Sequence, residues 1–133
     1  MPFVLDASVA ITWAMPDETH PVATLAYNQL DLEQALVPPI WWYEVRNILL
    51  INERRQRISQ ADSTRFLRQL DELPIEVDGV LDRPNLPDLA RQFRLTVYDA
   101  AYLELAIRNS VPLATLDKAL RGAAEAAGVP LLT

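Results

Sequence analysis

The sequence contains no cysteine and a single histidine, His20. These shortages exclude a disulfide framework, a thiolate zinc site, a cysteine nucleophile and any metal site that needs two imidazoles. Any bound metal ion must therefore be held by oxygen ligands. There are also only three glycines, and none comes directly after the first apolar segment. This excludes the glycine-rich phosphate loops of P-loop and dinucleotide-binding proteins.

The length and charge of the chain narrow the possibilities further. With 133 residues, half of them hydrophobic, we expect one domain spanning residues 1–133. The formal net charge of −6 does not attract a polyanion over long range, so contact with a nucleic acid would need a local basic patch. No secretory signal pattern and no bilayer-length apolar run is present, so we expect a cytoplasmic protein without membrane contact.

Short apolar strands are predicted to alternate with helices along the whole chain. The predicted strands are 3–5, 35–37, 75–77, 113–115 and a weak edge strand at 129–132. The predicted helices are 7–14, 20–32, 41–55, 59–73, 86–93, 98–108 and 117–127. This order is typical of an α/β fold, a three-layer α/β/α sandwich with a mostly parallel central sheet. Ligands of such sheets bind beyond the carboxyl ends of the strands.

Two aspartates follow predicted strands directly. Asp6 ends the first apolar segment, and Asp117 lies just after the strand predicted at 113–115. Each has a simple structural explanation, because aspartate is a favoured N-cap of a following helix. Parallel strands end at the same edge of the sheet, so these two carboxylates are also expected to lie near each other.

Two further acidic residues are predicted within helices. Glu44 shares a helical face with Ile40, Ile48 and Ile51, so the helical period turns it toward the core. A cap cannot explain Glu44 there, which leaves an internal salt bridge to an arginine as its structural explanation. Asp99 opens the helix at 98–108, where helix capping or a favourable interaction with the helix dipole is its structural alternative.

The four carboxylates together suggest metal chemistry. Close acidic groups repel one another, and this raises their pKa values unless cations neutralise them. Clusters that offer only oxygen ligands suit Mg²⁺ or Mn²⁺, which can activate a water molecule for cleavage of a phosphodiester bond. That reaction requires neither histidine nor cysteine. The residues therefore favour a carboxylate-bound divalent metal as the cofactor, either Mg²⁺ or Mn²⁺.

Four segments carry a resemblance that covers essentially the whole chain. They are Val4-Leu5-Asp6-Ala7-Ser8, Glu44 with Asn47 one turn later, Tyr98-Asp99-Ala100-Ala101-Tyr102, and Thr115-Leu116-Asp117. In this order they resemble the motifs of PIN-domain ribonucleases, specifically the small VapC-type toxins of type II toxin–antitoxin pairs. The resemblance implies a metal-dependent endoribonuclease in which Asp6, Glu44, Asp99 and Asp117 are catalytic and bind the metal.

The resemblance also implies supporting residues and partners. Ser8, Asn47 and Thr115 match positions that orient the carboxylates or a metal-bound water. A homodimer, a cognate antitoxin and an RNA substrate are expected. Arg54, Arg55 and Arg57 belong to the densest basic stretch of the chain and are candidate contacts for the RNA backbone, although a solvated helical hairpin explains them equally well.

Two other functions remain open at this stage. One is a housekeeping RNA-processing nuclease of the same fold, for which the chain lacks room for the additional domains that such enzymes usually carry. The other is a non-catalytic, receiver-like module that binds one Mg²⁺. Receivers carry adjacent acids after the first strand and a lysine near the last strand, whereas Ala7 follows Asp6 here and the one lysine, Lys118, comes after the fourth strand.

Overall fold

The computed structural model describes residues 1–79 and 85–133 and gives the chain four strands and eight helices within these residues. The strands are β1 (Phe3–Leu5), β2 (Ala35–Val37), β3 (Ile75–Val77) and β4 (Leu113–Ala114). The helices are α1 (Ala7–Ala10), the 3₁₀ helix η1 (Ile11–Ala14), α2 (Pro21–Gln29), α3 (Ile40–Arg54), α4 (Gln60–Asp71), α5 (Leu86–Phe93), α6 (Val97–Asn109) and α7 (Lys118–Ala126).

The sheet is parallel throughout, with the strand order β3-β2-β1-β4. The four principal strands and the parallel arrangement predicted from the sequence are therefore confirmed. The prediction of a fifth strand over 129–132 is wrong in its extent, because only Leu131 pairs with the sheet, through a single bridge to Leu113. Pro130 has no N–H to donate and β4 is only two residues long, so no ladder forms there.

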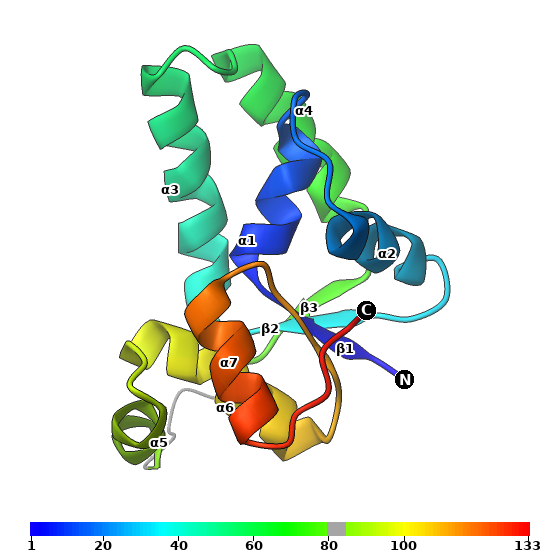
Figure 1. Cartoon of the computed structure of the whole chain (residues 1–133). Coiled ribbons are helices and arrows are strands. Elements are labelled where there is room, and N and C mark those ends of the chain that lie inside the picture. The colour runs from blue at the N-terminus through cyan, green and yellow to red at the C-terminus, as the bar shows by residue number, and fades with distance from the viewer. Residues whose placement is uncertain (80–84) are drawn as a thin grey trace.

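Helices cover both faces of the sheet, which confirms the three-layer α/β/α architecture. Figure 1 shows α1 to α4 on one side and α5, α6 and α7 on the other. Helix α6 packs directly on β1, β2 and β4, and it is itself flanked by α5 and α7. Among the described residues, no helix is both long enough and apolar enough to span a bilayer.

The buried face of α3 is shifted by one residue from the predicted one. Its buried line consists of Trp41, Val45, Leu49 and Asn52. Glu44 and Ile48 lie beside that line and are half-buried, so the prediction that Glu44 faces the core is corrected. The side chain borders a groove instead, because a helix packed on one side keeps its flanking positions partly open.

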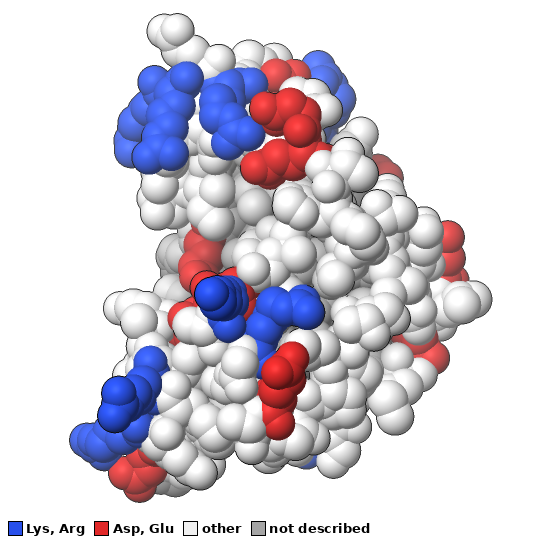
Figure 2. Space-filling model, viewed as in Figure 1, with Lys and Arg blue, Asp and Glu red and all other residues white. Residues whose placement is uncertain are grey.

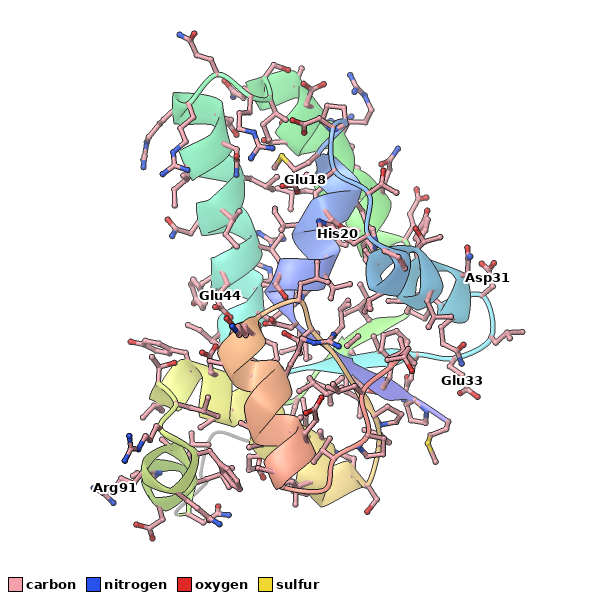
Figure 3. The ribbon with its side chains drawn as sticks, in the orientation of Figure 1. Glu18, His20, Asp31, Glu33, Glu44 and Arg91 are labelled. Carbon is pink, nitrogen blue, oxygen red and sulfur yellow. The ribbon has the colours of Figure 1, made fainter. Side chains whose placement is uncertain are left out.

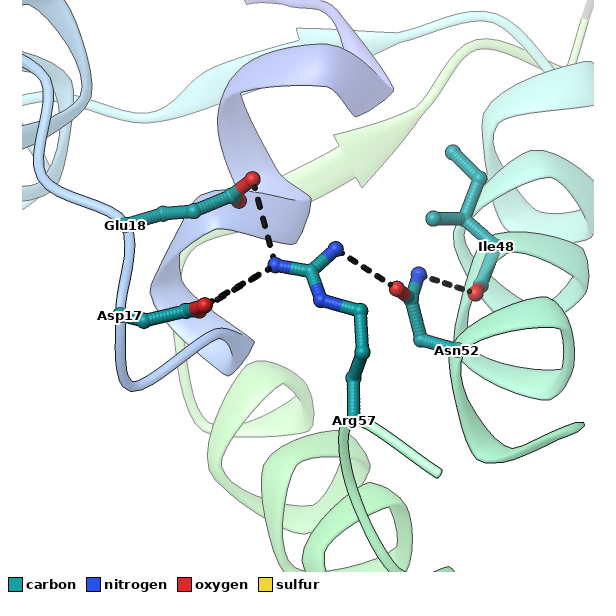
Figure 4. Close-up of polar contacts among 5 residues, drawn as sticks. All are labelled: Asp17, Glu18, Ile48, Asn52 and Arg57. Atoms are coloured by element: carbon teal, nitrogen blue, oxygen red, sulfur yellow. Dashed lines mark hydrogen bonds and ion pairs between the residues drawn. The ribbon is translucent and has the colours of Figure 1, made fainter. Parts of the chain in front are cut away.

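A polar cluster ties the turn after α3 to the loop that follows η1 (Figure 4). Arg57 donates to the Oδ1 atom of Asn52 at 2.9 Å and to Asp17 at 3.2 Å, and its guanidinium lies 3.6 Å from Glu18. Asn52, buried on α3, also donates to the backbone oxygen of Ile48 at 2.8 Å. The cluster fixes the tip of the α3–α4 hairpin against the loop.

We expect Arg57→Ala to lower the free energy of unfolding by about 1 kcal/mol, because the variant loses several hydrogen bonds of a half-exposed guanidinium. Arg55→Ala is the matched control, since Arg55 makes no ion pair within the described residues and its removal should cost no more than about 0.5 kcal/mol. Urea denaturation measures both values. Equal midpoints for the two variants would contradict the assigned role of the cluster.

Candidate metal-binding site

The candidate site lies where the strand order changes direction. The chain runs from β1 outward through β2 to β3 and then returns to β4 on the other side of β1. Asp6 follows β1 and Asp117 follows β4, so both stand at the carboxyl end of this switch point, the usual ligand-binding position of an open parallel sheet. The sheet topology thus explains why residues 111 positions apart in sequence meet.

One oxygen of the Asp6 carboxylate is held by two hydroxyl groups. Ser8 donates to Oδ2 at 2.6 Å and Thr115 donates to the same atom at 2.7 Å. The backbone N–H of Leu116 donates to the Ser8 hydroxyl and that of Asp117 to the Thr115 hydroxyl, which directs both hydroxyl protons to Oδ2. Although Asp6 occupies the N-cap position of α1, its side chain makes no capping hydrogen bond.

Glu44 is held from the opposite side by a tyrosine that the sequence analysis did not single out. The Tyr102 hydroxyl donates to Oε1 of Glu44 at 2.6 Å. Tyr102 is fully buried on α6, whereas Glu44 is half-buried on α3. The alternative of an internal salt bridge for Glu44 is wrong, because its partner is this neutral hydroxyl. In the sequence, the signal was the tyrosine three residues after Asp99.

Asp99 and Asp117, the other two acidic residues of the candidate site, lie at the N-termini of α6 and α7. Thr96 is the N-cap of α6 and accepts from the Asp99 N–H, so Asp99 is not itself the cap. Asp117 does cap α7, since its Oδ2 accepts from the N–H of Leu120 at 3.1 Å. Capping therefore accounts for one oxygen of Asp117, whereas Asp99 does not cap its helix and its carboxylate hydrogen-bonds to the Thr96 side chain.

The four carboxylates influence one another electrostatically. Burial raises the pKa of Asp6, and repulsion from Asp117 adds to the rise, against the hydroxyl hydrogen bonds that lower it. Burial also raises the pKa of Glu44, with further repulsion from Asp6 and Asp99. The pKa of Asp99 is raised by burial and then by the charges of Asp117 and Asp6. In residues 1–79 and 85–133, no lysine or arginine forms an ion pair with any of the four.

The donor set fits a hard divalent cation. All four side chains are carboxylates, and close anionic groups without a counter-charge are stabilised when a cation binds between them. No group of three or more His, Cys, Asp or Glu side chains within the described residues is already arranged to enclose a metal ion. The chemistry of these residues thus suits Mg²⁺ or Mn²⁺, while a closed coordination shell is not preformed.

The remaining predicted residues lie around this group. Asn47 is exposed and shares with Glu44 a shallow groove of about 510 Å³, which is also lined by Trp42, Tyr43 and Tyr98. Trp42 and Tyr43 are exposed, whereas Trp41 is buried in the core. Figure 3 shows Glu44 near the junction of α3 and α7, with His20 on another part of the surface.

Basic side chains form several groups on the face shown in Figure 2, one of them over the end of α3. Arg54 and Arg55 are exposed at the end of α3, next to the turn that joins it to α4. Arg57 is close by, but Asp17 and Glu18 pair with its guanidinium. Arg54 and Arg55 are thus separated from Glu44 by most of the length of α3, whereas Arg46 lines the same groove as Glu44.

Comparison with known proteins places this arrangement in a family. A sequence model of the PIN domain matches residues 3–126. The chain belongs to the PIN domain family. PIN domains are generally nucleases, and they typically use a divalent metal.

Solved structures share the PIN fold with this chain. PAE2754 from Pyrobaculum aerophilum superposes with a TM-score of 0.71 at 22% sequence identity, covering 92% of this chain and 84% of that protein. VapC20 from Mycobacterium tuberculosis, described as a toxin that cleaves the sarcin-ricin loop, gives a TM-score of 0.60 at 11% identity, covering 92% and 95%. No curated protein matches the sequence.

The raised pKa of Asp6 predicts that this PIN domain is more stable without that charge. A carboxyl group whose folded-state pKa is raised costs stability above that pKa and costs nothing below its unfolded value. In chelator at pH 7, Asp6→Asn should therefore raise the free energy of unfolding by about 0.5–2 kcal/mol. The gain should disappear as the pH falls toward 4, as followed by thermal unfolding across pH.

Asp62→Asn is the matched control with the opposite sign. Hydrogen bonds from Ser59 in the capping box of α4 lower the pKa of Asp62, so its charge stabilises the fold at neutral pH. The control should be less stable than the wild type at pH 7. An Asp6→Asn variant that is also less stable at neutral pH would refute the electrostatic account of the site.

Proposed function

We propose that this PIN domain is a metal-dependent endoribonuclease and acts as the toxin of a toxin–antitoxin pair. The observation that supports this most directly is the meeting of Asp6, Glu44, Asp99 and Asp117 without a neutralising ion pair among the described residues. We assign these four carboxylates as the catalytic and metal-binding residues. Mg²⁺ or Mn²⁺ bound there would supply an activated water and charge stabilisation for phosphodiester hydrolysis.

The residues of the chain then have distinct roles. Ser8 and Thr115 hold Asp6 by its Oδ2 atom and make no hydrogen bond to its Oδ1 atom. Asp117 fixes the start of α7 with one oxygen and offers the other. Asn47 lies in the same groove as Glu44, where its amide can orient a substrate phosphate or a water.

The shape of α3 supports a path for the RNA backbone. Arg55 follows Glu44 by eleven residues, which at 100° per residue returns it to nearly the same helical face, about 16 Å farther along. Arg54 is its neighbour at the basic end of the hairpin (Figure 2). We propose that Arg54 and Arg55 hold phosphates of an RNA strand whose scissile bond lies near Glu44, with Arg57 fixing the hairpin beneath them.

The toxin role rests on likeness to VapC20 and on the exposed groove beside the site. Trp42, Tyr43 and Tyr98 are exposed next to Glu44, and such an apolar surface is typical of a protein contact. We propose an antitoxin and a second copy of this chain as the partners. A housekeeping nuclease of the same fold would show the same chemistry without an antitoxin, and the receiver-like alternative has no support from these comparisons.

Cleavage of total cellular RNA by the purified protein tests the nuclease activity. We expect cleavage with Mn²⁺ or Mg²⁺, none with chelator, and a loss of about 100-fold or more in Asp6→Asn, because the variant removes one of the charges that hold the cation.

Asp31→Asn is the control, since Asp31 is an exposed carboxylate distant from Glu44 (Figure 3), and it should cleave as the wild type does. Equal cleavage by the wild type and Asp6→Asn, or cleavage that persists in chelator, would refute the proposed chemistry.

Arg55→Ala tests the RNA path. The variant should raise KM while leaving kcat unchanged, and the slope of log affinity against log salt should fall by about 0.7, as expected for one lost phosphate contact with a single strand. Arg91→Ala, an exposed arginine on α5, serves as the control and should preserve both values. An unchanged salt slope in Arg55→Ala would place the RNA elsewhere.

A further inference from the structure

The Tyr102 side chain connects α6 to α3, the two helices that carry Asp99 and Glu44. Its hydroxyl donates from α6 to Glu44 on α3, and the two residues are 58 positions apart in the sequence. The tyrosine is fully buried, and it lies one helical turn after Asp99 on the same helix. The buried Tyr102 side chain thus extends to within 2.6 Å of one carboxylate oxygen of Glu44.

The surroundings of the hydroxyl keep it a proton donor. Burial raises the pKa of Tyr102 far above its usual range, and the charges of Asp6 and Glu44 raise it further. The backbone amide of Ala7, next to Asp6, acts in the opposite direction and interacts with the phenol oxygen. The phenol hydroxyl is therefore the donor and Oε1 of Glu44 the acceptor of the 2.6 Å hydrogen bond between them.

The partner of Tyr102 is one particular oxygen of Glu44. Within the described residues, Oε1 accepts the Tyr102 hydrogen bond and Oε2 makes no hydrogen bond. Asp6 shows the same division, because Ser8 and Thr115 both donate to its Oδ2 atom. Hydroxyl groups of the chain thus occupy one oxygen of each carboxylate.

We propose that Tyr102 is a positioning residue that holds Oε1 of Glu44 and leaves Oε2 alone to the cation. This inference rests on the proposed metal-dependent function and adds a residue to which the sequence motifs assigned no role. The hydrogen bond restricts the rotation of a half-buried carboxylate that no ion pair fixes. Outer partners of this kind commonly change metal affinity by 10–100-fold when they are removed.

A Glu44 carboxylate that offers only Oε2 to the metal also affects which cation the site prefers. Ca²⁺ accepts carboxylates through both oxygens and tolerates irregular geometry, whereas Mg²⁺ requires a near-octahedral arrangement and usually keeps several waters. Mn²⁺ likewise suits octahedral oxygen sites. By occupying Oε1, Tyr102 favours the smaller octahedral cations over Ca²⁺. Its removal should therefore harm Mn²⁺ binding more than Ca²⁺ binding.

Calorimetric titration of the metal-free protein with Mn²⁺ and with Ca²⁺, without RNA, tests this role. We expect Tyr102→Phe to bind Mn²⁺ about 10–100-fold more weakly than the wild type and to lose less affinity for Ca²⁺. Tyr27→Phe deletes the same atom from an exposed tyrosine of α2 and should bind both cations as the wild type does. Thermal unfolding verifies that each variant is folded.

A double-mutant cycle with Glu44→Asp separates positioning from general stability. The shorter aspartate keeps the charge but draws the carboxylate away from Tyr102, so adding Tyr102→Phe to it should change Mn²⁺ affinity no further. Three results would overturn the role of Tyr102 while leaving the proposed nuclease intact. They are an unchanged Mn²⁺ affinity in Tyr102→Phe, an equal loss of affinity for Mn²⁺ and Ca²⁺, and additive losses of Mn²⁺ affinity in the cycle. A wild-type protein that binds no Mn²⁺ would overturn both.

Discussion

Repulsion among four carboxylates at one edge of the sheet is the constraint around which the site is organised. Asp6, Glu44 and Asp99 all have raised pKa values, with burial as the first cause and neighbouring negative charge as an additional one. Such an arrangement opposes folding at neutral pH, and the rest of the structure must hold it in place. A cluster of titratable groups with perturbed pKa values that costs stability is typical of functional sites.

The structure holds these charges with neutral hydroxyl groups and backbone amides. Ser8 and Thr115 donate to Asp6, Tyr102 donates to Glu44, and backbone N–H groups fix the hydroxyls of the first two. A neutral donor orients a carboxylate without cancelling its charge, whereas an arginine would compete with the cation. The carboxylates are thus ordered and keep the negative charge that the proposed metal ion would require.

The α3 helix links the proposed catalytic residues to the surface proposed to hold the RNA. Its first turns carry Glu44 and the exposed aromatic residues, and its last turn carries Arg54 and Arg55. The cluster around Arg57 anchors the end of this helix to the loop after η1. A protein with a net charge of −6 can therefore present a basic surface and an acidic site on the same rigid element.

The sequence by itself determined the four principal strands, the helices between them and the parallel sheet, because strand and helix periodicity are local properties. It also predicted Asp6, Glu44, Asp99 and Asp117 as the acidic site residues, and the resemblance to PIN-domain ribonucleases added Ser8 and Thr115. Only the tertiary structure decided that Glu44 borders a groove rather than the core, that Arg57 is paired, and that Tyr102 reaches Glu44. These outcomes depend on how α3 packs against α1 and η1 and how α6 packs on the sheet. Such packing joins residues far apart in sequence, and no local pattern encodes those contacts.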